Sequence, residues 1–310
     1  MNEFELINLL TSGLSTNSAM VKGPGDDCAV LDLGLPDRWV LFKTDAVVEL
    51  VHFRSDTEPE RIGHKAIGRC LSDIAAMGGM AVSAVVTLGL PASFDPEWLR
   101  RVYAGMDRLA KIHGVAISGG ETTSNPERML ISVAVIGTVE KTRCVFRSGA
   151  KVGDAIFVSG ELGGSIESRH LDFTPRLKEA RWLTEHYAVS SMIDLSDGLA
   201  GDLRHILMAS GVGAELMSGS IPISRTARLR ARAESPAKTP LLAALTDGED
   251  FELLFTVASC DAVPVMDGWK QRFPETRLTC VGRIASKSGL RLHDGQKSIE
   301  FKGTGYTHFS

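Results

Sequence analysis

An aspartate in the middle of an apolar helical segment is the feature that most constrains this chain. Residues 71–79 are LSDIAAMGG, so Asp73 lies among leucine, isoleucine, alanine and methionine. Burying a carboxylate without a partner costs several kcal/mol, so Asp73 needs a cation, a proton or several hydrogen-bond donors. An aspartate that caps a neighbouring loop would satisfy the same pattern. The segment therefore predicts a fold that brings polar or charged groups onto this helix.

Other acidic residues repeat the pattern, beside glycine or hydroxyl residues and next to apolar runs. They are Asp26, Asp27, Asp45, Asp194, Asp197, Glu249 and Asp250. Taken singly, such residues are typical of solvated turns, strand ends and helix caps. Several in one chain favour a shared metal site. Hard oxygen ligands without clustered histidine favour Mg²⁺ over zinc.

Composition excludes several classes of protein. The chain has 310 residues, enough for two domains of about 150 residues each. A net charge of −4 without a basic tract argues against non-specific nucleic-acid binding. The longest apolar stretch, residues 80–92, is broken by serine, threonine and proline, so no membrane span is expected. Scattered cysteines and the lack of a signal-like N-terminus predict a cytoplasmic protein.

Helical and strand-like patterns alternate along both halves of the chain. Helices are expected at residues 3–11, 57–77, 95–114, 175–188 and 198–209. Strands are expected at 28–31, 39–44, 82–88, 115–118, 130–139, 253–257 and 279–284. Thr57 with Glu60, and Asp95 before a proline, are typical of helix starts. The pattern predicts an α+β protein of two α/β-type domains, residues 1–146 and 147–310.

Two glycine-rich segments, SGGETT (118–123) and SGELGGS (159–165), are candidate phosphate-binding loops. Glycine lets backbone N–H groups approach a phosphate closely, although most glycine turns are only turns. The chain has no GxxxxGK[ST] motif, so it is not a P-loop enzyme. Phosphate charge must then be neutralised by Mg²⁺ and by basic residues such as Arg147 and Lys151. Both could equally be solvated linker charges.

Taken in order, these motifs resemble the thiamine-monophosphate kinase family, within the aminoimidazole ribonucleotide synthetase-like superfamily. The resemblance rests on GDDCAVL, TDAVVELVHF, LSDIAAMGG, SGGETT, RSGAKVGDAIFVSGELGGS, MIDLSDGLAGDL, DGEDFELLFT and GYTHF. It implies the two-domain fold of that superfamily and a homodimer whose sheet is formed by the N-terminal domains. It also implies ATP-dependent phosphorylation of thiamine monophosphate to thiamine diphosphate.

The resemblance also implies roles for individual residues. Mg²⁺ ligands would be Asp27, Thr44, Asp45, Asp73, Asp194 and Asp197, and metal contacts are also expected at Lys43 and Glu121. ATP would contact Tyr103, Gly120, Arg147 and Ser196, and thiamine monophosphate would contact His52, Glu249 and Tyr306. His52 could instead be structural, and the tyrosines could be packing aromatics. No catalytic side chain is expected, because the acceptor is already a phosphate and direct in-line transfer needs little general-base help.

Four residues depart from the family pattern. Glu121 and Ser124 replace aspartate and arginine in the usual GGDTTRG, and Leu50 replaces a glycine beside His52. Lys43 stands where a small hydroxyl residue is common. If the family's metal contact there uses a backbone carbonyl, Lys43 is harmless; if it uses a side chain, the ammonium could replace one metal ion. Two alternatives therefore stay open: a related phosphotransferase for another phosphorylated metabolite, and an ATP-binding pseudoenzyme.

Overall fold

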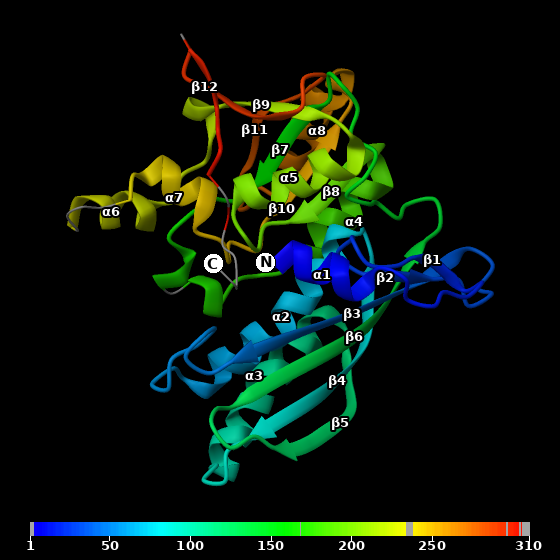
Figure 1. Cartoon of the computed structure of the whole chain (residues 1–310), viewed down its shortest axis with the longest axis vertical. Coiled ribbons are helices and arrows are strands. Elements are labelled where there is room, and N and C mark those ends of the chain that lie inside the picture. Colours follow the sequence, from blue (N-terminus) through cyan, green and yellow to red (C-terminus); the bar gives the residue numbers. More distant parts are fainter. Residues whose placement is uncertain (1–2, 168, 234–237, 296, 304, 306–310) are drawn as a thin grey trace.

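Each half of the chain builds one mixed β-sheet (Figure 1). The computed structural model describes residues 3–167, 169–233, 238–295, 297–303 and 305. All strands of the first sheet precede residue 141 and all strands of the second follow residue 154. The two sheets agree with the expected α+β fold, and the expected domain boundary falls between them.

The first sheet has the strand order β1-β2-β3-β6-β4-β5, and only the β4–β5 pair is parallel. Its strands are β1 (Met20–Lys22), β2 (Ala29–Leu31), β3 (Arg38–Val48), β4 (Met80–Leu90), β5 (Ala116–Ser124) and β6 (Leu130–Glu140). Helix α1 (Glu3–Thr11) precedes the sheet in sequence. Helices α2 (Pro59–Ala76) and α3 (Pro96–His113) lie together on one face (Figure 1). Leu41, Val86 and Val133 pack under them and are buried.

The opposite face of the first sheet has no cover among the described residues. Phe42 on β3 pairs with Ile136 on β6, and Val85 on β4 pairs with Ala134. Phe42, Val85 and Ile136 are each between 46% and 47% exposed. Strand side chains alternate between faces, so β3 presents Phe42 and Thr44 here and Lys43 and Asp45 to the helices.

The second sheet has the order β13-β12-β9-β11-β7-β10-β8, with only β9 and β12 parallel. Its strands are β7 (Ala155–Ser159), β8 (Val189–Asp194), β9 (Gly213–Met217), β10 (Leu253–Val257), β11 (Leu278–Ala285), β12 (Gly289–His293) and β13 (Ser298–Glu300). Its helices are α4 (Leu177–His186), α5 (Leu199–Ser210), α6 (Arg225–Ala233), α7 (Pro240–Thr246) and α8 (Ala262–Arg272). Short 3₁₀ turns are η1 (Ser165–Glu167), η2 (Arg169–Leu171), η3 (Ser218–Ser220) and η4 (Ser259–Asp261).

Both faces of the second sheet are buried, which explains the apolar strands β7 and β10. Phe157 and Phe255 stack at 5.4 Å on the face toward Trp269 of α8. Val158 and Leu254 point to the other face, into a core with α5 and α7. The first of these cores continues into α2, so the two halves share a hydrophobic interior.

Several sequence-based expectations for the elements need correction. Thr57 does not cap α2, because its hydroxyl accepts from Arg54 and the N-cap residue is Glu58. Asp95 does cap α3 as predicted, accepting from the Glu97 N–H at 2.9 Å. The SGGETT segment is not a loop: it forms strand β5, because backbone pairing with β4 satisfies its N–H groups. β3 runs four residues further than expected, so Asp45 lies within the strand.

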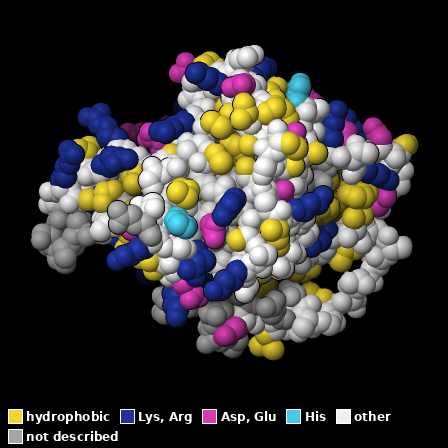
Figure 2. Space-filling model, turned by 90° about the horizontal axis from the view of Figure 1, so that it is seen from above, with side chains coloured by type: hydrophobic (Ala, Val, Ile, Leu, Met, Phe, Trp, Pro, Cys, Tyr) yellow, Lys and Arg dark blue, Asp and Glu magenta, His cyan; other side chains and the backbone are white. Residues whose placement is uncertain are grey.

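No helix among the described residues combines the length and the apolarity needed to cross a bilayer. On the face drawn in Figure 2, Lys and Arg side chains alternate with Asp and Glu rather than forming one continuous basic surface. All five cysteines are free, and Cys28 and Cys70 are buried in the first core.

Candidate active site

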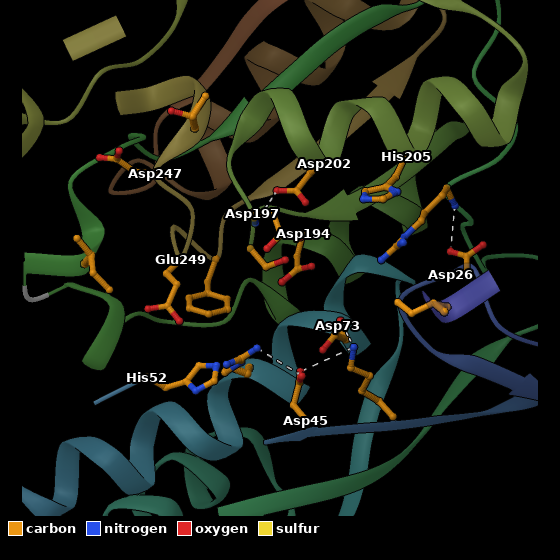
Figure 3. A pocket seen from close by; sticks show the side chains of 18 of the residues that line it. Asp26, Asp45, His52, Asp73, Asp194, Asp197, Asp202, His205, Asp247 and Glu249 are labelled. Carbon is orange, nitrogen blue, oxygen red and sulfur yellow. Dashed lines mark hydrogen bonds and ion pairs between the residues drawn. The ribbon is translucent and has the colours of Figure 1, made fainter. Parts of the chain in front are cut away.

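A cavity of about 880 Å³ lies where the two halves meet, and acidic side chains from both halves line it (Figure 3). Asp45 comes from β3 and Asp73 from α2 in the first half. Asp194 ends β8, and Asp197 follows it in the turn before α5. The structure thus brings together residues that are more than 100 positions apart in the sequence.

Asp27, Asp73 and Asp194 form the centre of this site. Each offers a carboxylate oxygen within 4.8 Å of the oxygens of the other two, and all three side chains are buried. Asp27 lies in the turn between β1 and β2, so three separate segments converge here. This arrangement explains why an apolar helix carries an aspartate at position 73.

Each of these carboxylates is held by one protein group. The Arg147 guanidinium donates to Asp27 Oδ1 at 2.6 Å. Lys43 Nζ lies 2.9 Å from Asp73 Oδ1. The Ser72 hydroxyl donates to Asp194 Oδ2 at 2.7 Å, which ties α2 to the end of β8. One oxygen of each carboxylate is therefore fixed in orientation.

Burial makes two of these carboxylates, Asp73 and Asp194, hard to ionise. Burial, reinforced by the charge of Asp27, raises the pKa of Asp194 to about 7. Burial also raises the pKa of Asp73 well above its usual range, although Lys43 opposes the effect. A divalent cation binding here would displace protons, so its affinity would rise with pH.

The residues present fit a magnesium ion. The Oδ2 atom of Asp27 is buried and has no hydrogen-bond partner among the described residues. Oxygen atoms bound to one Mg²⁺ at about 2.1 Å lie about 3–4 Å apart, and the oxygens of this group all lie within 4.8 Å of one another. All the donors are hard oxygen atoms, which Mg²⁺ prefers over softer ligands.

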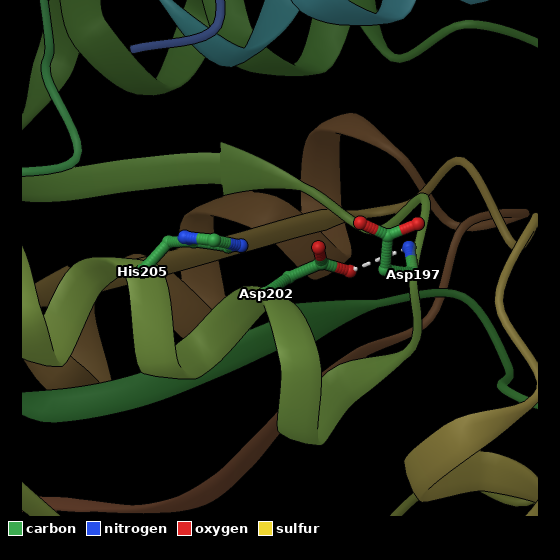
Figure 4. A group of neighbouring side chains, drawn as sticks. All are labelled: Asp197, Asp202 and His205. Carbon is green, nitrogen blue, oxygen red and sulfur yellow. Dashed lines mark hydrogen bonds between the residues drawn. The ribbon is translucent and has the colours of Figure 1, made fainter. Parts of the chain in front are cut away.

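A second group, Asp197, Asp202 and His205, lies along the first turns of α5 (Figure 4). Their ligand atoms also lie within 4.8 Å of one another. Asp202 Oδ2 accepts from the Asp197 N–H at 3.0 Å, so this carboxylate also satisfies the start of the helix. Asp197 is therefore close to Asp202 and His205, which sequence analysis did not single out.

A fully buried lysine organises the other end of the cavity. Lys65 Nζ donates to the His52 carbonyl at 2.8 Å and to Glu249 Oε2 at 2.7 Å, and lies 2.7 Å from His170 Nδ1. Burial raises the pKa of Glu249, but His170 and Lys65 outweigh it and lower the pKa to about 2. Glu249 is thus held ionised. His52 accepts the Val48 N–H on Nδ1, which places the hydrogen of a neutral ring on Nε2.

Three non-glycine residues with left-handed backbone lie at this end: Leu50 (φ 63), Glu249 (φ 55) and Phe251 (φ 50). Glu249 and Phe251 line the cavity. Leu50 does not line it and is 59% exposed, so its side chain leaves the pocket beside His52 open. The positive φ gives a physical reason for glycine at this position in the family pattern.

Some predicted site residues lie elsewhere. Tyr103, Gly120 and Glu121 line a second cavity of about 620 Å³ between α3 and β5. Across the sheet, Asp45 on β3 pairs with Val133 on β6, Val133 pairs with Val86 on β4, and Val86 pairs with Gly120 on β5. Three strand spacings, or about 14 Å, therefore separate Asp45 from Gly120. Thr44 lies on the uncovered sheet face, with its hydroxyl 3.3 Å from that of Ser132. Lys151 lines neither cavity. Tyr306 is outside the described residues.

Arg69, Lys65 and His170 are site residues that the sequence analysis missed. Lys65, Arg69 and Asp73 recur every four residues on α2, so they share one stripe of the helix. That spacing was a usable signal. His170 had none, because it lies in the short turn η2 and reaches Lys65 only through the tertiary fold.

Comparisons with known proteins agree with this geometry. The family description "AIR synthase related protein, N-terminal domain" matches residues 25–139. A thiamine-monophosphate kinase of Rhodopirellula baltica is 40% identical over 275 residues, covering 86% of this chain and 84% of that protein. The chain belongs to the thiamine-monophosphate kinase family. Another family member, from Bacillus subtilis, is 33% identical over the full length of both chains.

Solved structures extend the likeness to the whole fold. A structure described as AaThiL complexed with AMPPCP and TMP has a TM-score of 0.84 at 30% identity, and the match covers 99% of this chain and 97% of that one. An Escherichia coli hydrogenase maturation protein, HypE, matches with a TM-score of 0.73 at 20% identity, which shows a shared fold only. Both halves therefore keep the arrangement of the family.

We expect Glu249→Gln to lower the free energy of unfolding by about 2–3 kcal/mol at neutral pH, because buried Lys65 loses its counter-charge. The pKa of Glu249 is lowered from 4.5 to about 2, so its stabilisation is complete above pH 4.5 and disappears toward pH 2. The difference from wild type should shrink over that range in urea unfolding. Glu121→Gln, on an exposed strand, should change little; equal effects of both substitutions would contradict this assignment.

Leu50→Gly should raise the free energy of unfolding by up to about 1 kcal/mol, because glycine adopts the positive φ without steric cost. Urea unfolding measures the effect. Val51→Gly next to it, where no positive φ occurs, should lower stability and is the matched control. A loss of stability at both positions would mean that Leu50 makes contacts worth more than its backbone strain.

Proposed function

We propose that this chain transfers the γ-phosphoryl group of ATP directly to the phosphate of thiamine monophosphate, giving thiamine diphosphate and ADP. The observation that carries the proposal is the buried Asp27–Asp73–Asp194 group, of which Asp73 and Asp194 line the cavity between the two halves. Bound Mg²⁺ would screen the two anionic reactants and hold them in line. Asp45 and Asp197 line the same cavity beside this group.

ATP would bind toward Arg147 and Ser196. Arg147 lines the cavity and is fixed by Asp27, so its guanidinium needs little reorganisation to meet a phosphate. Ser196 lies in the turn that enters α5, where backbone N–H groups and the helix dipole favour negative charge. The chain's basic groups would thus receive the phosphates while the carboxylates receive the metal.

Thiamine monophosphate would bind at the end formed by His52 and Glu249. The ionised Glu249 supplies negative charge suited to the cationic ring of thiamine, and His52, whose Nδ1 accepts the Val48 N–H, lines the same end of the cavity. Val51 and Phe251 add apolar wall to the same part of the cavity. No side chain needs to act as a nucleophile, because the acceptor phosphate already carries the attacking oxygen.

We also propose that two copies associate through the uncovered face of the first sheet. An apolar face containing Phe42, Val85 and Ile136 is costly to leave in water. Thr44 and Glu121 lie on the same face, since Glu121 pairs with Thr87, which pairs with Ser132 beside Thr44. Association would enclose both of these predicted contacts.

Purified protein with Mg²⁺, ATP and thiamine monophosphate should form thiamine diphosphate and ADP in equal amounts. Turnover with a different phosphorylated acceptor only would identify a related phosphotransferase. Nucleotide binding without turnover of any acceptor would identify a pseudoenzyme. A chemically competent phosphoprotein intermediate would contradict direct transfer.

Asp73→Asn should reduce Mg²⁺-dependent turnover at least about 100-fold, because it removes one carboxylate from the central group. Asp37→Asn, with a side chain 75% exposed, is the matched control and should keep full activity. Circular dichroism and thermal unfolding check that both variants fold. Full activity in folded Asp73→Asn would remove Asp73 from the metal site.

Val85→Arg should convert a dimer to monomers, because it places an unpaired charge in the middle of the apolar face. Light scattering coupled to size exclusion measures the mass. Val263→Arg on α8, at 66% exposure, is the control and should leave the mass unchanged. A monomeric wild type, or a Val85→Arg variant that remains dimeric, would rule out this interface.

A further inference from the structure

Two basic side chains, Lys43 and Arg69, lie against one carboxylate, Asp45. Lys43 Nζ is 3.7 Å from Asp45 Oδ2, and Arg69 Nη2 is 3.5 Å from Asp45 Oδ1. The same ammonium is 2.9 Å from Asp73 Oδ1, so it bridges the two carboxylates. All four side chains line the cavity (Figure 3 labels the two aspartates).

The pairing follows from the local structure of the two elements. Lys43 and Asp45 are two residues apart on β3, so both point toward α2. Arg69 and Asp73 are four residues apart on α2, so they lie one turn apart on the same stripe. The strand and the helix each present one cation and one carboxylate, and the charges alternate across the junction.

This geometry leaves little place for a metal ion between Asp45 and Asp73. A bridging Mg²⁺ would need one oxygen of each aspartate at about 2.1 Å, and the Lys43 ammonium already occupies that position. Two unit charges 4 Å apart repel by about 4 kcal/mol at an effective dielectric constant of 20, and a divalent ion doubles that. Metal and ammonium therefore exclude each other at this position.

The neighbouring group differs. Asp27 Oδ2 is buried and has no hydrogen-bond partner among the described residues, and one carboxylate oxygen of Asp27 lies within 4.8 Å of oxygens of Asp73 and Asp194. On the Asp45 side, by contrast, the unpartnered buried atom is a donor, Nε of Arg69. Among the described residues, the Asp27 side thus keeps a buried oxygen without a donor, and the Asp45 side keeps a buried donor without an acceptor.

We propose that Lys43 replaces one divalent ion, so that this chain binds metal at Asp27, Asp73 and Asp194 but not between Asp45 and Asp73. On the Asp45 side, Lys43 and Arg69 instead contact an oxygen of a phosphate ligand directly. The proposal rests on the proposed function for the identity of that ligand as a phosphate ester. The positive charge of Lys43 is permanent there, whereas a metal ion would exchange with solvent.

Metal stoichiometry tests the proposal without measuring activity. The full chain is titrated with Mn²⁺, with and without the ATP analogue AMPPCP, and bound Mn²⁺ is counted from the electron paramagnetic resonance signal of the free ion. Lys43→Ser should bind about one more Mn²⁺ per chain than wild type at saturation. Lys43→Arg keeps the charge and should bind as many as wild type.

Lys151→Ser is the matched control, because Lys151 is exposed and lines neither cavity. It should leave the stoichiometry unchanged. If Lys43→Ser fails to fold, Lys43→Gln keeps the length of the side chain and should show the same additional ion. Thermal unfolding of each variant checks that the Mn²⁺ titration is carried out on folded protein.

Equal Mn²⁺ stoichiometry in wild type and folded Lys43→Ser, or Lys43→Gln, would overturn the proposal. It would mean that the ammonium moves aside when metal binds, or that no ion binds there in either protein. Failure of wild type to bind AMPPCP would count against the proposed function instead. The titration without nucleotide would still decide the role of Lys43.

Discussion

Buried carboxylates that must be neutralised are the constraint on which this structure depends. Asp27, Asp73 and Asp194 are brought together from both halves of the chain, where their desolvation would be prohibitive without partners. The protein compensates part of this cost through Arg147 and Lys43, and an oxygen of Asp27 has no hydrogen-bond partner in the part of the chain that the structure describes. Protein groups therefore compensate these carboxylates only in part, which supports the proposed metal site.

The junction between the halves carries this arrangement. Ser72 binds Asp194 across it, Lys65 binds Glu249 across it, and Glu140 at the end of β6 meets Arg181 of α4 at 2.5 Å. A hydrophobic core also runs from the first sheet through α2 into the second half. Polar and apolar contacts together fix the distance between the two sets of carboxylates, as the proposed in-line transfer would require.

The sequence was most informative where a residue type conflicted with its surroundings. Asp73 in an apolar helix, and the aspartates beside glycine turns, predicted the acidic group correctly because buried carboxylates have few physical explanations. Glycine was a poorer guide, since SGGETT forms a strand once β4 is available for pairing. The fold class and most elements followed from periodicity, whereas the order of the strands depended on long-range pairing that periodicity does not encode.

Positively charged side chains of the site were harder to predict from the sequence than its carboxylates. A lysine or arginine is compatible with a solvated surface almost anywhere, so only the four-residue spacing of Lys65, Arg69 and Asp73 could have indicated a shared stripe. The positions of Gly120 and Glu121 depended on sheet topology, which put two strands, β6 and β4, between Asp45 on β3 and β5. The sequence thus identified the acidic half of the site better than its basic half.

The two faces of strand β3 connect the uncovered sheet surface to the cavity. Phe42 and Thr44 face the uncovered sheet surface, while Lys43 and Asp45, their immediate neighbours, face the cavity. A shift of this strand along one side must also move side chains on the other. If two copies pair through the surface, ligand affinity and self-association are thermodynamically linked, and each must strengthen or weaken the other equally. Occupancy of the cavity would then depend on how concentrated the protein is.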